Sequence, residues 1–304
     1  MIVYNILVRF YGKLHNYKNV PFWVLTPIRR IVRLISYILL PRVLKVNRRN
    51  KGIVQKDLIV SFTSFPSRIK DVWQVVESLK NQSILPEKII LWLSREQFNT
   101  KDSIPISLLS REDELFEIRL VDLDLRSHKK YYYAMIEFPE KTIITCDDDI
   151  YYHPDMIKIL LEGSNKFKGS IISNVTKQLS FYENGDIMPY NQWNDEIKAY
   201  SSENLFQIGV GGVLYPSNSL DKMLFRSDLF TSLTPLADDI WLNCMARMKN
   251  TLVIQSSKNI LPLPIKSNSP TLTSVNCDEN FNDSQLENLR LYLVKNGFND
   301  IYHV

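Results

Sequence analysis

The chain has 304 residues, 45% apolar and 23% charged, which is typical of a globular protein and enough for one large α/β domain. Its net charge of +4 hides an asymmetry: residues 1–56 contain twelve Lys or Arg and no acid, whereas the rest carries 25 basic and 33 acidic side chains. This predicts an anionic partner for the basic segment alone. Three cysteines without a CxxC pair, Cys146, Cys244 and Cys277, argue against a disulfide framework or a zinc site and favour a reducing compartment.

The basic segment contains the first predicted helix, over residues 21–43 (PFWVLTPIRRIVRLISYILLPRV). Apolar side chains recur there at helical spacing, at Ile28, Ile31, Val32, Ile35, Ile38 and Leu39. The other face is expected to carry Arg29, Arg30 and Arg33. Three central arginines exclude a transmembrane helix, and neither an early apolar core nor a small-residue cleavage site marks a signal peptide.

Two interpretations of this helix stay open. A basic amphipathic helix beside aromatic residues fits a segment, within residues 1–50, that lies in a membrane interface. A helix packed on the body of the protein, with its arginines facing water, gives the same pattern. No nucleic-acid-binding motif follows, so we expect no nucleic-acid partner. Residues 47–56 (NRRNKGIVQK) have the character of a linker, which predicts an arm and linker over 1–56 and a domain over 57–304.

Strands and helices alternate after residue 57. Strands are predicted over 58–62, 88–93, 117–121, 142–145, 170–175 and 251–255. Helices are predicted over 69–79, 128–138, 156–161, 218–226, 236–248 and 284–296. Asn184-Gly185 predicts a hairpin, and residues 262–270 a loop. This alternation predicts an α/β fold, a doubly wound and mostly parallel sheet flanked by helices.

The most informative stretch is KTIITCDDDIYYHP, residues 141–154. A β-branched run ends in Asp147, Asp148 and Asp149, and Pro154 suits the first turn of a helix. Three adjacent carboxylates repel one another, and burying them is costly without a cation. Mg²⁺ or Mn²⁺ would relieve this repulsion, because such ions prefer carboxylate oxygens and bridge to phosphates. Open α/β sheets bind ligands at the carboxyl ends of their strands, so we predict a metal site rather than a solvated acidic turn.

Two later stretches also carry signals. FQIGVGGVLYP, residues 206–216, places Gly209, Gly211 and Gly212 within four positions, which suggests a backbone forced close to a ligand or into positive φ. It lacks the GK[ST] ending of a phosphate loop. LADDIWLNCMARM, residues 236–248, predicts a helix with Asp238 and Asp239 in its first turn, where acids also complement the helix dipole.

These blocks, with SFTSFPSRI after the first strand and DLRSHKKYYYA before the acidic strand, resemble bacterial glycosyltransferases of the GT-A fold. Those enzymes assemble capsular, lipopolysaccharide or exopolysaccharide chains, and the resemblance covers roughly residues 57–288 in block order. It implies a GT-A-like sheet, a nucleotide-sugar donor, Mn²⁺ or Mg²⁺, and a saccharide or lipid-linked saccharide acceptor. Together with the basic amphipathic helical arm, it implies a peripheral enzyme at the cytoplasmic face of a bacterial inner membrane.

The resemblance also assigns roles to residues. Asp147 and Asp149 match the DxD pattern and are the expected metal ligands, with Asp147 and Asp148 contacting the donor. In inverting members one acid of the later pair removes the proton from the acceptor hydroxyl, and we expect Asp239 as that base with Asp238 as its helper. The remaining donor-binding residues are expected to be Thr63, Ser64, Arg68, Arg126, Lys129 and Lys130. Acceptor binding is expected from Gly211, Gly212 and Trp241, although such a tryptophan is more often part of the core.

Other functions fit parts of the pattern. A retaining transferase would use the same fold and metal. A nucleotidyltransferase on a similar sheet would usually show a glycine- and basic-rich loop after its first strand, and SFTSFPSRI lacks the glycines. A non-catalytic scaffold of a polysaccharide assembly complex would not need the intact acidic triplet.

Overall fold

The computed structural model describes residues 2–14, 20–46, 52–194, 203–257, 260–266 and 281–303. Its helices are α1 (Ile2–Lys13), α2 (Phe22–Lys45), α3 (Val72–Lys80), α4 (Ile106–Leu109), α5 (Lys129–Glu137), α6 (Met156–Lys166), α7 (Ser227–Leu233), α8 (Asp238–Met248) and α10 (Phe281–Lys295). Its strands are β1 (Ile53–Thr63), β2 (Ile84–Ser94), β3 (Phe116–Val121), β4 (Thr142–Thr145), β5 (Ile150–Tyr151), β6 (Ile171–Ser173), β7 (Thr176–Gln178), β8 (Leu205–Gln207), β9 (Val213–Tyr215), β10 (Val253–Gln255) and β11 (Leu263–Pro264).

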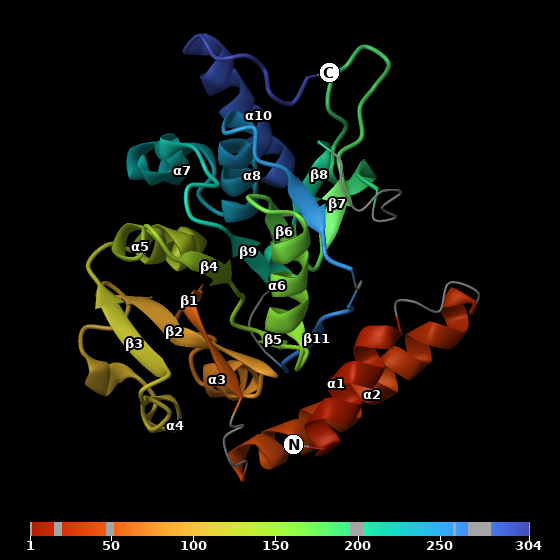
Figure 1. Ribbon diagram of the computed structural model, residues 1–304, viewed down its shortest axis with the longest axis vertical. Helices are drawn as coiled ribbons and strands as arrows, with labels where there is room; N and C mark the ends of the chain where they lie inside the picture. The colour runs from red at the N-terminus through yellow and green to blue at the C-terminus, as the bar shows by residue number, and fades with distance from the viewer. Residues whose placement is uncertain are drawn as a thin grey trace.

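A seven-stranded sheet organises the described part of the chain, in the order β10-β6-β9-β4-β1-β2-β3 (Figure 1). The pairs β4–β1, β1–β2, β2–β3 and β10–β6 are parallel. Strand β9 runs antiparallel to both its neighbours, β4 and β6. The predicted α/β class, a mostly parallel sheet flanked by helices, is therefore confirmed. Because β9 is reversed, its amino end lies at the same sheet edge as the carboxyl ends of β1 and β4.

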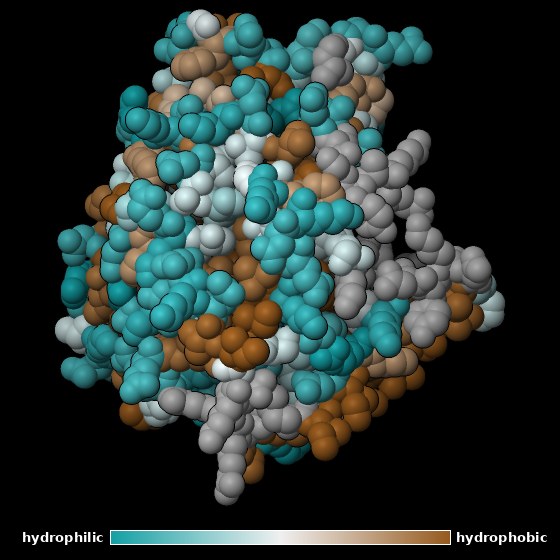
Figure 2. All heavy atoms as spheres, in the orientation of Figure 1, coloured by the Kyte–Doolittle hydropathy of each residue, from teal (hydrophilic) through white to brown (hydrophobic). Residues whose placement is uncertain are grey.

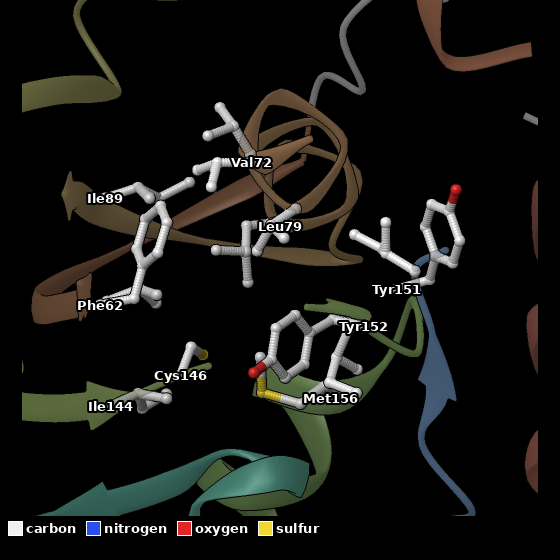
Figure 3. Close-up of a cluster of buried hydrophobic side chains, with 14 of the residues drawn as sticks. Phe62, Val72, Leu79, Ile89, Ile144, Cys146, Tyr151, Tyr152 and Met156 are labelled. Carbon is white, nitrogen blue, oxygen red and sulfur yellow. The ribbon is translucent and has the colours of Figure 1, made fainter. Parts of the chain in front are cut away.

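The sheet is buried on both faces, which explains why its central strands read as continuous apolar runs. Side chains alternate along β1: Val60 and Phe62 pack with α3 and α6, whereas Ile59 packs on the other face against α5. Figure 3 shows part of the first core, where Phe62, Leu79 and Met156 converge from β1, α3 and α6. A second core joins α7, α8 and α10 to β6, β9 and β10.

The amino-terminal arm is a pair of helices, α1 and α2, that lie side by side (Figure 1). Helix α1 was not predicted, and α2 confirms the helix expected over 21–43. The buried residues of this pair belong to the same core as β1 and α3: Tyr4, Val8, Tyr11, Leu14, Leu25, Val32, Leu40 and Leu44. The arm is thus packed on the body, as the second interpretation proposed.

The orientation of α2 differs from that interpretation in one respect. Arg29 and Arg33 do not simply face water, because they donate hydrogen bonds to the Leu14 carbonyl (3.2 Å) and the Tyr11 hydroxyl (2.6 Å) of the neighbouring chain segment. Most of the apolar stripe chosen from the sequence is instead exposed, including Ile31, Ile35 and Ile38. No described helix combines the length and apolar character needed to cross a membrane.

Several local predictions need correction. The linker expected over 47–56 is wrong for residues 53–56, which begin β1, and residues 47–51 lie outside the described part. Pro154 lies in the turn that precedes α6 rather than in its first turn. A short 3-10 helix, Lys222–Phe225, replaces the helix expected over 218–226. The expected loop over 262–270 contains β11, while residues 267–270 and Cys277 lie outside the described part.

Other local predictions are confirmed. The Asn184-Gly185 hairpin forms, with an antiparallel bridge between Phe181 and Ile187 and a positive φ of 86° at Gly185. Cys146 and Cys244 are free and buried, as expected for inert thiols.

Candidate active site

A cavity of about 490 Å³ opens at the sheet edge where β1 and β4 end. Parallel neighbours end at the same edge, so Thr63 and Ser64 after β1 lie beside the acidic triplet after β4. Residues Ile208 and Val210, ahead of the reversed strand β9, also line the cavity. The first turn of α8 supplies Asp238 and Asp239. Topology thus brings together blocks that are spread along the chain from Thr63 to Asp239.

The three acids of the triplet have different environments. Asp148 is buried and accepts hydrogen bonds from the Ser64 hydroxyl (2.5 Å) and from Arg68 Nη1 (2.6 Å). Asp149 is more open, and its Oδ2 lies 2.9 Å from the same Arg68 nitrogen. Burial raises the pKa of Asp149 to about 6, with the carboxylate of Asp147 as the next cause. All three acids line the cavity, but Asp148 is held by Ser64 and Arg68, whereas the carboxylates of Asp147 and Asp149 are more exposed there.

Lys130 joins the triplet to α8. Its buried ammonium lies 2.9 Å from Asp147 Oδ1 and 2.9 Å from Asp238 Oδ2. Burial acts to lower the pKa of Lys130, but Asp147 and Asp238 outweigh it, so the pKa lies well above its ordinary value. Lys130 is therefore charged and holds the end of β4 at a defined position relative to the start of α8.

The adjacent acids of α8 differ in protonation. Burial acts to raise the pKa of Asp238, but the ammonium of Lys130 outweighs it and the pKa lies below the ordinary value. Asp239 Oδ2 accepts a hydrogen bond from the Gly209 backbone nitrogen (3.0 Å). Burial, followed by repulsion from Asp238, raises the pKa of Asp239 to about 7. Asp239 is thus the acid of this pair poised to exchange a proton near neutral pH.

Gly209 is the glycine that the site requires. A Cβ atom there would lie 3.3 Å from Asp239 Oδ1, 3.3 Å from Lys130 Nζ and 3.4 Å from Asp147 Oδ1. A side chain at this position would crowd the three charged groups that meet beside it. The sequence predicted that this segment lies close to a ligand or adopts positive φ: Gly212 has a φ of 86°, and the approach of Gly209 to a ligand stays a prediction.

Two buried tyrosines, Tyr152 and Tyr4, fix the backbone of the acidic triplet through hydrogen bonds. The Tyr152 hydroxyl accepts a hydrogen bond from the backbone nitrogen of Asp147 (2.6 Å), and Figure 3 shows Tyr152 reaching toward Cys146 at the end of β4. The backbone carbonyl of Tyr152 in turn accepts a hydrogen bond from the Tyr4 hydroxyl of α1 (2.6 Å). The backbone of the triplet is thus fixed by contacts that extend into the arm.

The expected donor-binding residues all line the cavity: Thr63, Ser64, Arg68, Arg126, Lys129, Lys130, Asp147 and Asp148. Some are already engaged within the protein, since Thr63 Oγ1 donates to the Trp92 carbonyl (2.8 Å) and Lys129 pairs with Asp124. Sequence reasoning missed Asp124, although it is the first residue of the block DLRSHKKYYYA. It also missed Asn282, which α10 brings to the cavity from the far end of the chain.

The three expected acceptor-binding residues do not line the cavity. Trp241 is fully buried and donates its indole hydrogen to the Leu224 carbonyl (3.2 Å), so neither ring face is open to a sugar. A Cβ on Gly211 would lie 2.7 Å from Val175 Cγ2, and Gly212 has a φ of 86°. Packing and backbone conformation account for these two glycines. The cavity wall on this side is formed instead by Tyr190, Phe206, Ile208, Val210 and Leu236.

The donor set at the cavity fits a divalent cation that is held only partly by protein. Six carboxylates and four basic side chains line the cavity. Among the described residues, no group of three or more His, Cys, Asp or Glu side chains is arranged to enclose a metal ion. The candidate hard oxygen donors are Asp147 and Asp149, each of which has one carboxylate oxygen paired with a basic side chain, Lys130 or Arg68. Such a pair suits Mg²⁺ or Mn²⁺ that completes its coordination with water and phosphate oxygens.

Comparisons with known proteins give similarity at the level of structure alone. No protein-family model matches the chain, and no curated protein matches its sequence. Solved structures with partial similarity include apo UDP-glucose pyrophosphorylase, with 11% identity, a TM-score of 0.41, and coverage of 80% of this chain and 100% of that one. HddC from Yersinia pseudotuberculosis shows 12% identity, a TM-score of 0.39, and coverage of 76% and 98%.

A third solved structure, CMP:2-keto-3-deoxy-manno-octonic acid synthetase complexed with CTP, shows 10% identity and a TM-score of 0.41. The match covers 77% of this chain and 98% of that one. Similarity at this level does not assign an activity, because unrelated functions share α/β folds. The function must be argued from the cavity itself.

Proposed function

We propose that the protein is a metal-dependent glycosyltransferase of the inverting type, which moves a sugar from a nucleotide-sugar donor to a saccharide or lipid-linked saccharide. The observation that carries this proposal is the convergence of Asp147, Asp149 and Asp239 on one cavity, where Lys130 pairs with Asp147 on one side and with Asp238, the neighbour of Asp239, on the other. Transfer between two bound molecules needs a site for the leaving diphosphate and a base for the attacking hydroxyl, and these acids supply both.

The donor would occupy the side of the cavity formed by the ends of β1 and β4. Asp147 and Asp149 would hold Mn²⁺ or Mg²⁺, which when bound stabilises the negative charge of the departing diphosphate. Thr63, Ser64 and Arg68 would border the nucleoside, with Arg68 held in place by Asp148 and Asp149. Arg126 lies at the same cavity and would face the phosphates.

Asp239 would act as the general base. Its carboxylate accepts a proton from the acceptor hydroxyl as that oxygen forms a bond to the anomeric carbon of the donor sugar. The bond between the anomeric carbon and the diphosphate oxygen breaks, and the nucleoside diphosphate leaves with the bonding electron pair. Asp238 would assist indirectly, because its charge helps to raise the pKa of Asp239 to about 7. The raised pKa supports Asp239 over Asp238, whose pKa lies below the ordinary value.

The structure of the first loop bears on the nucleotidyltransferase alternative. A nucleotidyltransferase must stabilise the pyrophosphate that leaves a nucleoside triphosphate, and a glycine- and basic-rich loop usually does this. Here the loop after β1 contributes Arg68, whose guanidinium is engaged by two carboxylates. The raised pKa of Asp239 suits a residue that accepts a proton from the acceptor hydroxyl. A retaining mechanism would not give Asp239 this role. These observations favour the inverting glycosyltransferase.

The proposed setting is the synthesis of surface polysaccharide at the cytoplasmic face of a bacterial membrane. This setting rests on the sequence blocks that resemble bacterial transferases and on the arm, which has twelve basic side chains and no acids over residues 1–56. A membrane location would bring the cavity close to a lipid-linked acceptor.

Product analysis tests the proposed reaction. Purified protein with Mn²⁺ would be incubated with a panel of nucleotide sugars, and separately with nucleoside triphosphates and sugar 1-phosphates. A glycosyltransferase releases a nucleoside diphosphate from one donor by slow hydrolysis, and EDTA abolishes the release. Release of pyrophosphate from a nucleoside triphosphate would instead identify a nucleotidyltransferase. Neither product, together with no thermal stabilisation by Mn²⁺ and nucleotides, would support the scaffold.

A further inference from the structure

The two arm helices leave large apolar side chains exposed on their outer faces. The residues opposite them on each helix lie in the core, so these side chains point away from the body. They include Ile2, Ile6 and Phe10 of α1 and Trp23, Leu34 and Ile38 of α2. Trp23 is 75% exposed and Leu34 is 61% exposed. Figure 2 shows hydrophobic atoms along the edge of the molecule where Figure 1 places α1 and α2.

Helix α2 is apolar on two opposite faces, which packing on the body does not explain. Leu25, Val32, Leu40 and Leu44 satisfy the inner contact. The outer residues contribute nothing to that contact, and large apolar side chains gathered in one patch on a surface usually mark an interaction site. A helix of a globular protein that only packs on a core normally has a polar outer face.

The charge around this apolar face is of one sign. Exposed basic side chains occupy both helices, with Lys13 on α1 and Arg30, Arg42 and Lys45 on α2. No acid occurs before Asp57. Apolar side chains bordered by Lys and Arg match a bilayer that contains anionic phospholipids, where apolar groups enter the interface and cations meet the headgroups.

We propose that the outer face of α1 and α2 binds in the plane of an anionic phospholipid surface. This inference extends the membrane setting proposed above but is tested by lipid binding alone, so its failure would leave the proposed reaction untouched. The helix pair lies on the bilayer and is not a flexible tether, because its inner face is fixed to the body. The fixing contacts include Tyr4 with Tyr152, Arg9 with Asp155 (2.6 Å), and Leu261 nitrogen with the Gly12 carbonyl (3.2 Å).

Those contacts imply a defined orientation of the body on the membrane. Tyr152 also bonds the backbone nitrogen of Asp147, so the chain of contacts leads from the lipid-facing helix to the acidic triplet in two steps. A rigid connection of this kind keeps the cavity at a constant height above the lipid surface, which suits an acceptor that is itself anchored in lipid.

The protein contains its own reporter for this binding. Trp23 is exposed, whereas the other four tryptophans, Trp73, Trp92, Trp193 and Trp241, are buried. Vesicles of phosphatidylcholine with about a third phosphatidylglycerol, added to the full-length protein at low salt, should shift tryptophan emission to the blue and protect it from acrylamide. Trp23→Phe should remove the shift while the protein still co-sediments with the vesicles.

A paired substitution supplies the decisive comparison. Leu34→Glu with Ile38→Glu should lower the vesicle-bound fraction roughly tenfold or more, because two carboxylates then face the anionic surface. Leu291→Glu with Val294→Glu, on exposed positions of α10, is the matched control and should bind as wild type does. Both variants alter exposed side chains, so their melting temperatures should stay unchanged.

Three outcomes would overturn the inference. One is the absence of binding to anionic vesicles at low salt. Another is equal binding by wild type and the Leu34→Glu, Ile38→Glu variant, or equal binding to vesicles of phosphatidylcholine alone. The third is a concentration-dependent dimer, seen by light scattering and dissolved by the same substitutions, which would identify a second copy of the chain as the occupant of this face.

Discussion

Asp238 and Asp239 are adjacent in the sequence, but the fold shifts the pKa values of their carboxyl groups in opposite directions. Lys130 compensates the charge of Asp238, which keeps that carboxylate ionised. Asp239 receives a single backbone hydrogen bond from Gly209 and the repulsion of its neighbour, so it holds its proton up to about pH 7. Both acids occupy the first turn of α8, where the helix dipole favours negative charge. The difference between them therefore comes from their partners and not from the helix.

This difference predicts a pH dependence. The base form of Asp239 is the deprotonated one, so kcat/KM should rise with pH through about 7 and then level off. Asp239→Asn should lower the rate by about 10²–10⁴-fold and abolish that rise, while donor binding is retained. Steady-state nucleotide release from about pH 5 to about pH 9, a range that spans the raised pKa of Asp239, measures both effects. A wild-type rate that falls as the pH rises through 7 would remove Asp239 from this role.

The raised pKa of Asp149 leads us to expect that this residue lowers the stability of the metal-free protein at neutral pH while serving as a metal ligand. Its pKa of about 6 in the folded protein exceeds the ordinary value of 3.8, so the folded state loses stability as pH rises through this interval. Asp149→Asn removes that penalty, and the metal-free variant should be more stable than wild type at pH 8 by up to about 3 kcal/mol. The two proteins should match near pH 4. Urea unfolding at both pH values measures this.

The same substitution should abolish stabilisation by Mn²⁺. A variant that loses stability at pH 8, or that keeps the full Mn²⁺ effect, would contradict the placement of Asp149 at the cation.

At the scale of elements, the site is a consequence of where strands end. Sequence reasoning predicted the strand TIIT with its acidic end and the helix that begins at Asp238, because β-branched runs and helical periodicity are local signals. It grouped the blocks through their resemblance to GT-A glycosyltransferases, and it placed the acidic triplet at a ligand site by the rule that open α/β sheets bind ligands at the carboxyl ends of their strands. It missed α1. The apolar residues Ile2, Ile6 and Phe10 of this helix face outward. Its hydrogen bond from Tyr4 to Tyr152 joins residues that are 148 positions apart.

The residues expected to bind the acceptor also show what local sequence patterns cannot predict. Trp241 and Gly211 were expected at the acceptor because an aromatic ring and a glycine-rich backbone suit sugars. Whether a tryptophan faces a cavity or a core depends on the tertiary contacts of α8, and here it packs against Phe230 with ring centroids 5.9 Å apart. The same holds for Asn282, which enters the cavity only because α10 packs on α7 and α8.

Lys130 is the contact that joins these elements, which gives a prediction for stability. Lys130→Gln would leave two carboxylates without their shared cation, and the free energy of unfolding should fall by about 3–5 kcal/mol. Lys158→Gln is the matched control, because Lys158 forms only an exposed pair with Glu162 at 4.0 Å and should change stability by at most about 0.5 kcal/mol. Chemical denaturation compares them. Equal stability of the two variants would show that Lys130 does not hold β4 and α8 together.

At the scale of the whole molecule, the arm is part of the fold. Tyr11 is fully buried in the core that the arm shares with the body, and its hydroxyl accepts a hydrogen bond from Arg33 of α2, whereas its neighbour Phe10 is 44% exposed. Tyr11→Ala should therefore lower the free energy of unfolding by about 3–5 kcal/mol. Phe10→Ala should change it by about 0.5 kcal/mol or less while weakening vesicle binding. Thermal and urea unfolding test this contrast, and a neutral Tyr11→Ala would indicate an arm that is only loosely attached.

We propose that the acids at the cavity form a cation-dependent site for a nucleoside diphosphate beside a separate base. Calorimetric titration of the protein with UDP, GDP, CDP, ADP and dTDP, with Mn²⁺ and then with EDTA, tests it most directly. We expect one nucleotide to bind only when Mn²⁺ is present, Asp239→Asn to bind it as wild type does, and Asp149→Asn not to bind it. Binding that persists with EDTA and in Asp149→Asn, or no binding to any of the five, would contradict it.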